Sequence, residues 1–175
     1  MASNARSQRL PLFERAVRAG SGRAPSAGVA SRAELLESVR EALSALFNAT
    51  ALDAVMDLTD HPQARSSVLN YGLPDLSGRT ASSIDHSVLE RQLRQAICTF
   101  EPRLRPETVT VHVVSDAPCS HNRLSFEVTA QCSGAPFEDH VAFRTELDLE
   151  SGDVRVTRSR GELGDSGFKS RPRVA

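Results

Sequence analysis

Two stretches in the first hundred residues carry apolar side chains at helical spacing. In residues 31–47 the apolar positions recur at steps of three and four, which is typical of an amphipathic helix. The tetrapeptide Ser31-Arg32-Ala33-Glu34 has the form of a capping box, in which hydroxyl and carboxylate each accept a backbone N–H. The pattern predicts a helix that begins at Ser31 and is closed by residues 48–50. The apolar residues up to Leu58 are expected to add a further turn or two before Pro62 breaks the pattern.

The second helical stripe lies in residues 84–100 and is followed by a proline. Ser82 provides a weak cap signature at its start, and Pro102 disfavours helical backbone at Glu101, so the helix is expected to end there. If residues 101–104 then run extended, Glu101 and Arg103 project to one side, opposite Pro102 and the apolar residue that follows. On physical grounds alone this is a helix stop with a local ion pair, because exposed pairs contribute little to stability.

After the second helix the period of the apolar residues changes to two. Three clear alternating runs and a shorter fourth one cover residues 109–113, 124–132, 141–149 and 154–157, and Thr145 is the one polar residue on the apolar side of its run. Such alternation is typical of an antiparallel sheet with one face in solvent, and the helical stripes need its apolar face. The sequence therefore predicts an α+β fold. N-terminal helices and a central helix pack on an antiparallel sheet of three to four strands, in a single two-layer domain.

The two ends of the chain differ from this central part in composition. Residues 1–30 are rich in Ser, Ala, Gly and Arg, with one apolar island that predicts a short helix over residues 10–18. Because so short a helix is unstable alone in water, it is expected to dock, either on its own domain, which is the default, or on a partner. Residues 159–175 lack any apolar period and are expected to form a disordered tail. The predicted domain thus occupies residues 31–158, after a flexible N-terminal segment.

The loop of residues 67–78 mixes apolar anchors with residues that favour turns. Gly72 permits positive φ and Pro74 restricts φ, while the side chain of Asn70 can bond its own backbone. With Tyr71 and Leu73 beside them, these residues predict a loop held against the domain surface in a fixed shape. Residues 70–74 are either a packed connector or a preformed interface loop, and composition does not separate the two.

Composition narrows the class of protein. The 175 residues carry 21 Lys and Arg against 22 Asp and Glu, a formal net charge of −1, so no overall field favours nucleic acid or anionic membrane. The three cysteines form no disulfide framework, and neither a signal peptide nor a membrane-spanning apolar run is recognisable. We expect a soluble cytoplasmic protein that binds no nucleic acid and does not insert into membranes.

No pattern in the sequence predicts catalysis or a cofactor. Glycine loops that cradle phosphate are missing, as are the GxSxG and HExxH motifs. Cys119, His121, Cys132 and His140 do not match the spacing of a zinc module, so we expect no metal site. Acids such as Glu90, Glu101, Glu127, Glu138 and Asp139 are present, but nothing in their spacing places a pair across a cleft as a glycosidase requires. We therefore expect no catalytic residues, no cofactor and no enzyme activity.

Four stretches taken together resemble a known family. They are LFER at residues 12–15, ELLESV at 34–39, SVLNYGLPDLSG at 67–78 and FEPRL at 100–104, and they occur in the same order as in that family. Over residues 10–158 the chain resembles the TssE proteins, type VI secretion baseplate components of the tail-lysozyme-like wedge family of contractile phage tails. The motifs at residues 70–78 and 101–104 are specific in combination.

The resemblance implies a structural role in a contractile injection machine. Such proteins contact other wedge subunits, here TssF, TssG and TssK, in a baseplate docked at the inner membrane. They connect to the sheath subunits TssB and TssC, whose core fold is similar, and so are candidates to nucleate the sheath. The resemblance also implies that Glu101, Pro102 and Arg103 form the main contact with wedge partners.

The residue chemistry agrees with such a contact. Arg103 is suited to take a partner's carboxylate bidentately, while Glu101 either orients the guanidinium or meets a basic group of the partner. Their removal is expected to weaken the interface but to cost the free monomer little. Exposed sheet edges are further candidates to receive a partner strand. A peptidoglycan-cleaving, lysozyme-like hydrolase is the alternative function, and an unrelated binding module is a third.

Overall fold

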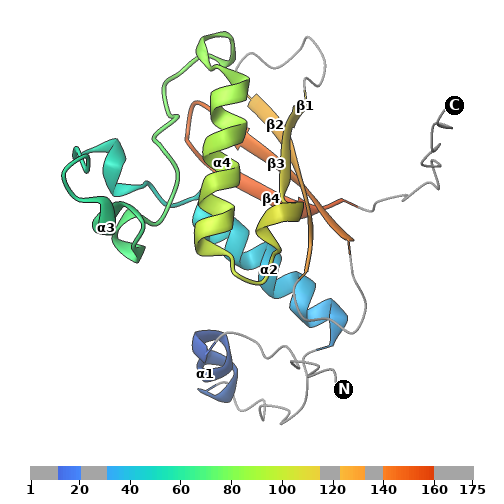
Figure 1. Ribbon diagram of the computed structural model, residues 1–175. Helices are drawn as coiled ribbons and strands as arrows, with labels where there is room; N and C mark the ends of the chain where they lie inside the picture. The colour runs from blue at the N-terminus through green and yellow to red at the C-terminus, as the bar shows by residue number, and fades with distance from the viewer. Residues whose placement is uncertain (1–11, 21–30, 115–122, 133–139, 160–175) are drawn as a thin grey trace, which may run out of the picture.

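The computed structural model describes residues 12–20, 31–114, 123–132 and 140–159 (Figure 1). The helices are α1 (Leu12–Gly20), α2 (Arg32–Phe47), α3 (Pro62–Arg65) and α4 (His86–Phe100), with short 3₁₀ turns η1 (Leu52–Ala54), η2 (Val68–Asn70), η3 (Ala81–Ser83) and η4 (Pro106–Thr108). The strands are β1 (Thr110–Val114), β2 (Arg123–Gln131), β3 (His140–Asp148) and β4 (Val154–Arg158). The expected tail falls largely in residues 160–175, and Cys119 and His121 also lie outside the described residues.

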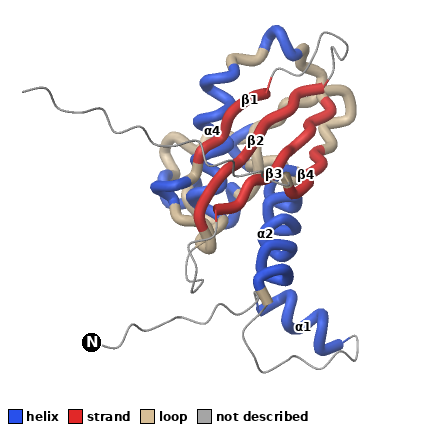
Figure 2. The backbone as a smooth tube through the Cα atoms, turned by 90° about the vertical axis from the view of Figure 1, so that its right-hand side faces the viewer, coloured by secondary structure: helices blue, strands red, loops and turns tan. Residues whose placement is uncertain are grey.

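The four strands form one antiparallel sheet in the order β1-β2-β3-β4, so each strand pairs with its neighbour in the chain. Helices α2 and α4 cover one face of this sheet, and Figure 2 shows the other face without a helix. The predicted α+β two-layer fold is confirmed, with four strands. The alternation of burial along β2 and β3 places every second side chain in the core, as the period of two predicts.

The core between the layers is built from aliphatic side chains with few aromatic ones. Phe47 of α2 meets Phe126 of β2 edge to face, with ring centroids 5.6 Å apart. Val39, Leu43, Leu93, Ile97, Val128 and Phe143 are completely buried around them. Thr145 is also completely buried, and its Oγ1 has no hydrogen-bond partner among the described residues. The one polar residue predicted on the apolar side of a strand is therefore in the core.

The capping box predicted at Ser31 is confirmed. The Ser31 Oγ accepts the N–H of Glu34 at 3.2 Å, and the Ser31 N–H donates to Glu34 Oε2 at 2.9 Å. The weak cap at Ser82 is wrong, because Ser82 lies in η3 and Asp85 caps α4 instead. The Asp85 carboxylate accepts the N–H groups of Ser87 and Val88, which a serine one turn earlier cannot reach.

The chain after α2 does not continue as the expected helical turns. It forms η1, α3 and η2, which project from the domain as a side lobe, residues 52–70 (Figure 1). Leu58 is buried, but Val55 and Met56 are 79% and 55% exposed. Asn70 explains the lobe's compact shape, since its side chain accepts the N–H of Asp53 and donates to the carbonyl oxygen of Arg65.

The expected short N-terminal helix is present, and the structure describes it over residues 12–20. Its Leu12 and Val17 are 77% and 55% exposed. Docking of this helix, on its own domain or on a partner, stays a prediction.

Candidate partner-binding site

The candidate site begins where α4 ends, at Glu101. The Glu101 N–H still donates to Ile97, and the Leu104 N–H donates to the Glu101 carbonyl oxygen at 3.1 Å, so residues 101–104 form a tight turn. The expected extended conformation is wrong, because proline at the second position of a turn has the φ that the turn requires. Glu101 and Arg103 nevertheless meet, since the turn returns the arginine side chain to the carboxylate.

Glu101 and Arg103 form a two-pronged ion pair. Arg103 Nη2 lies 2.6 Å from Glu101 Oε2, and Arg103 Nε donates to Oε1 at 2.7 Å. The backbone N–H of Arg103 also donates to Oε1, at 3.1 Å. The side chains of Glu101 and Arg103 are only 4% and 16% exposed. Such a pair is costly to break, because removal of one partner leaves a buried charge uncompensated.

Ser38 of α2 completes this cluster. Arg103 Nη1 donates to Ser38 Oγ at 2.6 Å, and Nη2 lies 3.4 Å from the Ser38 carbonyl oxygen. Ser38 is itself 3% exposed in the middle of the apolar face of α2. The cluster of Ser38, Glu101 and Arg103 therefore joins the end of α4 to α2. The expectation that changes at Glu101 or Arg103 cost the free monomer little is revised, because this pair is not a surface pair.

The arrangement changes what Arg103 can offer a partner. Its Nε and Nη2 are already used in the two-pronged bond to Glu101. A partner carboxylate therefore cannot take the same pair of donors unless Glu101 is displaced. Pro102 is exposed at the tip of the turn, and Leu104 behind it is buried in a bridge to Cys132. Of the four residues in this turn, Pro102 is the exposed one.

The loop of residues 70–74 packs its backbone against the segment after α2. The Leu73 N–H donates to Ala49 and its carbonyl oxygen accepts from Ala51, both at 2.8 Å. Asn70, Gly72 and Leu73 are buried. Tyr71 lies edge to face with Phe100 at 5.3 Å, and burial raises the pKa of its phenol. Tyr71 and Pro74 keep part of their surface in solvent, so these two residues are the ones open to a partner.

Both edge strands of the sheet are contacted by helix side chains. At β1 the Val113 N–H donates to Glu90 Oε1 at 2.7 Å, and just before β1 Arg94 Nε donates to the Val109 carbonyl oxygen at 2.9 Å. At β4 the Asn48 amide exchanges two hydrogen bonds with the backbone of Val154, at 2.8 and 2.9 Å. The expectation of exposed edges is therefore wrong at these positions, since side chains of α4 and α2 occupy the backbone groups.

The described residues offer no arrangement of catalytic groups. The pKa values of five carboxyls in this part of the chain are shifted, and all five are lowered: Glu37, Asp57, Asp75, Asp85 and Asp148. A general acid needs a raised carboxyl pKa. Burial raises the pKa of the Cys98 thiol, which keeps it protonated and weakly nucleophilic. No group of three or more His, Cys, Asp and Glu that could hold a metal is found in the described ranges.

The comparison with known families defines the class of this protein. Residues 33–136 match baseplate wedge protein gp25, and since the match covers more than half of the chain, the protein belongs to this family, which also includes TssE. The family is structural and forms part of the baseplate of contractile systems. It lends no support to the lysozyme-like alternative.

Two further findings concern relatives of the chain and the length of its helices. No individually curated protein matches the chain. Within the part of the chain that the structure describes, no helix has the length and apolar character needed to cross a membrane.

Sequence reasoning found Glu101 and Arg103 but not their third partner. Ser38 lies among Leu35, Leu36 and Val39 on the apolar face of α2. This position was the sequence feature that could have indicated a buried polar role. A serine there needs a buried hydrogen-bond partner, and sequence alone does not say which one. Asn48, Glu90 and Arg94 gave no comparable signal, because polar residues at helix surfaces are ordinary.

Proposed function

We propose that this chain is the TssE-type wedge subunit of a type VI secretion baseplate. In this role it binds the wedge subunits TssF, TssG and TssK, and it helps to connect or nucleate the sheath of TssB and TssC. The baseplate would lie in the cytoplasm, docked at the inner membrane. The observation that carries the proposal is the family match over residues 33–136, which includes Ser38, Glu101 and Arg103.

The turn of residues 101–104 is the proposed contact with wedge partners. Three N–H donors of Arg103 bond the Glu101 carboxylate and hold the turn in one conformation. The turn is therefore already ordered before a partner binds Pro102. Preorganisation of this kind reduces the entropic cost of association. The role of Glu101 and Arg103 is then to shape and support the surface that Pro102 presents.

The test is co-expression with TssF, TssG and TssK, followed by co-purification. We expect the wild-type chain to be retained with the wedge subunits, and Pro102→Glu to be lost from them. Pro102 is exposed, so this variant should lose only the roughly 0.4–1 kcal/mol that a proline contributes to a turn, and it should stay folded. Ser82→Glu adds the same charge at an exposed residue of η3 and should leave binding intact. Failure of the wild-type chain to co-purify with any wedge subunit would overturn the proposed function.

The hydrolase alternative has its own measurement. Purified protein is incubated with peptidoglycan, and soluble fragments are measured for the wild type and for Glu90→Gln and Glu127→Gln. We expect no release above a heat-treated control, because Glu90 is engaged by the Val113 N–H and Glu127 lies on the solvent side of the sheet. Release that disappears in either variant would contradict the structural role.

A further inference from the structure

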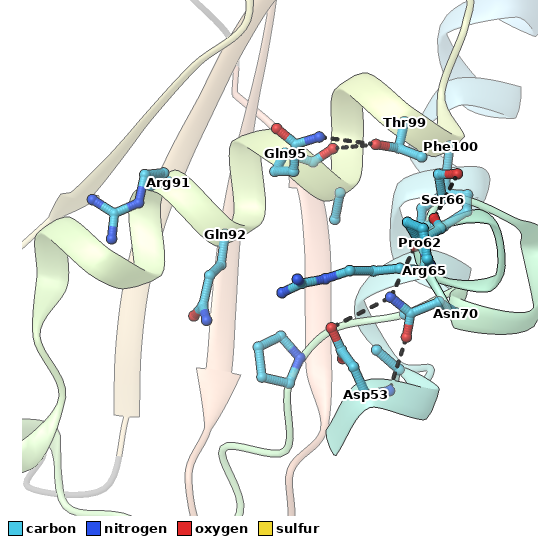
Figure 3. Close-up of a pocket in the computed structure, with 14 residues that line it drawn as sticks. Asp53, Pro62, Arg65, Ser66, Asn70, Arg91, Gln92, Gln95, Thr99 and Phe100 are labelled. Atoms are coloured by element: carbon cyan, nitrogen blue, oxygen red, sulfur yellow. Dashed lines mark hydrogen bonds between the residues drawn. The ribbon is translucent and has the colours of Figure 1, made fainter. Parts of the chain in front are cut away.

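A cleft separates α4 from the side lobe, residues 52–70, on the flank of the domain. Its volume is about 520 Å³ (Figure 3). One wall is the polar stripe of α4 that carries Arg91, Gln92 and Gln95, and the other is formed by the lobe with Arg65. Neither the turn of residues 101–104 nor the two contacted sheet edges line it, so it is distinct from the partner contact proposed above.

The two walls are held in place by buried contacts. Asn70, 8% exposed, joins η1 to the end of α3 through the N–H of Asp53 and the carbonyl oxygen of Arg65. Gly72 then fixes the lobe to the segment after α2, because its backbone lies against Ala49 with φ of +134°. The cleft is therefore a feature of the folded domain and does not depend on how an exposed loop happens to lie.

The residues that line the cleft carry more positive than negative charge. Arg65 and Arg91 come from opposite walls, and their guanidinium groups make no hydrogen bond or ion pair with the residues that the structure describes. Figure 3 shows Arg65 reaching across the cleft toward α4, with Gln92 on the facing wall. The one carboxylate that lines the cleft, Asp53, already accepts a hydrogen bond from Asn70 at 3.4 Å. Two guanidiniums against one carboxylate favour an anionic ligand.

The other residues that line the cleft indicate which kind of anionic ligand it would bind. Carboxamides of Gln92 and Gln95 stand along one wall, while Pro74, Ala96 and Phe100 provide apolar surface. Carboxamides both donate and accept, and so match the alternating N–H and C=O groups of an extended peptide. A phosphate group offers acceptors only and gains nothing from the amide oxygens or from Asp53. The lining therefore favours a peptide with a carboxylate over a phosphate ligand.

We propose that this cleft binds an extended acidic segment of a partner protein, with one Asp or Glu side chain at Arg65 and another along α4 at Arg91. It is a second partner site, and no residue of the turn 101–104 lines it. The proposal rests on the proposed function only for the identity of the partner, which would then be another wedge subunit. The binding chemistry itself, two guanidiniums above amides and an apolar surface, does not depend on that identity.

The first test is a charge reversal with a matched control. Arg65→Glu combined with Arg91→Glu is expected to weaken binding of the wedge subunits on the order of tenfold or more. Arg79→Glu makes the same change at an exposed arginine outside the cleft and should have no effect. Melting temperatures should be equal in all three proteins, because Asn70 bonds the backbone of Arg65 and not its side chain. Equal binding by the double variant and the control would overturn the proposal.

The second test identifies the occupant. A photo-crosslinking amino acid replaces Gln95, and the captured peptide is sequenced after illumination of the co-expressed complex or of cells. We expect a segment that contains Asp or Glu, and we expect its change to Lys to restore binding to the Arg65→Glu, Arg91→Glu protein. Capture of a different acidic protein with the same rescue would support the cleft and overturn the wedge assignment.

The remaining outcomes contradict the cleft proposal. They are absence of a cross-link in both settings, a captured segment without acids, or lack of rescue. Binding of inorganic phosphate or single-stranded DNA that requires Arg65 and Arg91 would also overturn it in favour of a phosphate site. Loss of wedge binding by the wild-type protein, by contrast, contradicts only the proposed function.

Discussion

Among the glycines that the structure describes, Gly72 is the one where an added Cβ would meet backbone atoms within 4 Å. Its φ of +134° is a conformation that L-residues rarely adopt, and an added Cβ would lie 2.7 Å from the backbone nitrogen of Ala51 and inside contact distance of the Ala49 carbonyl. This close approach lets Leu73 exchange hydrogen bonds with Ala49 and Ala51. The side lobe is thereby attached to the domain through a residue that has no side chain.

We expect Gly72→Ala to destabilise the protein by roughly 2–5 kcal/mol, from strained backbone and the displaced contact together. Gly78→Ala is the matched control, because Gly78 also has positive φ, +72°, but nothing lies within 4 Å of its added Cβ. That variant should cost only about 1 kcal/mol. Urea denaturation of both proteins measures the difference, and equal midpoints would contradict the close-approach argument.

The charged pair at the end of α4 gives a second prediction at this scale. Arg103→Ala leaves the Glu101 carboxylate buried and unpaired, so the free energy of unfolding should fall by about 3–5 kcal/mol. Arg103→Lys keeps the charge but not the two-pronged geometry, and should lie between that variant and the wild type. Thermal melts check this order, with the exposed Arg79→Ala as a control that should change little. A melt of Arg103→Ala that matches the wild type would show that the pair contributes nothing to the fold.

At the scale of elements, α4 is defined by what stands at its two ends. Asp85 accepts the first N–H groups, and the turn at Pro102 follows the last helical residue. The hydroxyl of Ser87, followed by the N–H of Val88, holds the pKa of Asp85 below its usual range. A carboxyl whose pKa is lower in the folded than in the unfolded chain stabilises the fold at neutral pH, and this stabilisation is lost as the pH falls through the folded pKa.

We therefore expect Asp85→Ala to lower the melting temperature at pH 7, and the deficit to shrink as the pH falls below the normal range of aspartate. Asp85→Ser retains an acceptor for the same N–H groups but has no charge, so its deficit should be smaller and independent of pH. Melts of the three proteins between pH 7 and acid pH test this. A deficit for Asp85→Ala that grows on acidification would contradict the role of the ionised cap.

At the scale of the whole molecule, the two helices that cover the sheet also contact its two edges. Arg40 of α2 and Asn48, the residue that follows this helix, bond the backbone of β4. Glu90 of α4 bonds the backbone of β1, and Arg94 bonds that of Val109 just before this strand. Unpaired edge strands are templates for pairing with another chain, and such contacts oppose it. Addition of a partner strand during assembly would have to displace these side chains at the positions they occupy.

We expect Asn48→Ala combined with Arg94→Ala to lower stability by about 1–3 kcal/mol and to promote self-association that increases with concentration. The physical reason is that the Val154 and Val109 backbone groups lose their side-chain partners at the sheet edges. Light scattering across a concentration series provides the measurement, and Glu150→Ala, at an exposed turn, is the control. A double variant that stays as monomeric as the control would show that these contacts do not protect the edges.

The limits of sequence reasoning are visible in the same elements. The alternation in residues 124–132 and 141–149 predicted strands that the structure confirms, because a strand with one buried face must repeat every second residue. The apolar residues after α2 predicted further helical turns, and this prediction is wrong, because Val55 and Met56 are exposed on a projecting lobe. Helical spacing over a few residues does not distinguish a continued helix from such a lobe.

The sequence by itself determined the two long helices, an antiparallel sheet of three to four strands, the capping box at Ser31 and the pairing of Glu101 with Arg103. These features follow from local spacing and from residues that are neighbours in the chain. Only the tertiary structure decided that the pair is buried on Ser38, that helix side chains contact both sheet edges, and that Arg65 faces α4 across a cleft. The physical reason is that each of these contacts joins residues far apart in the chain, whose partners are chosen by packing of the layers and not by any local pattern.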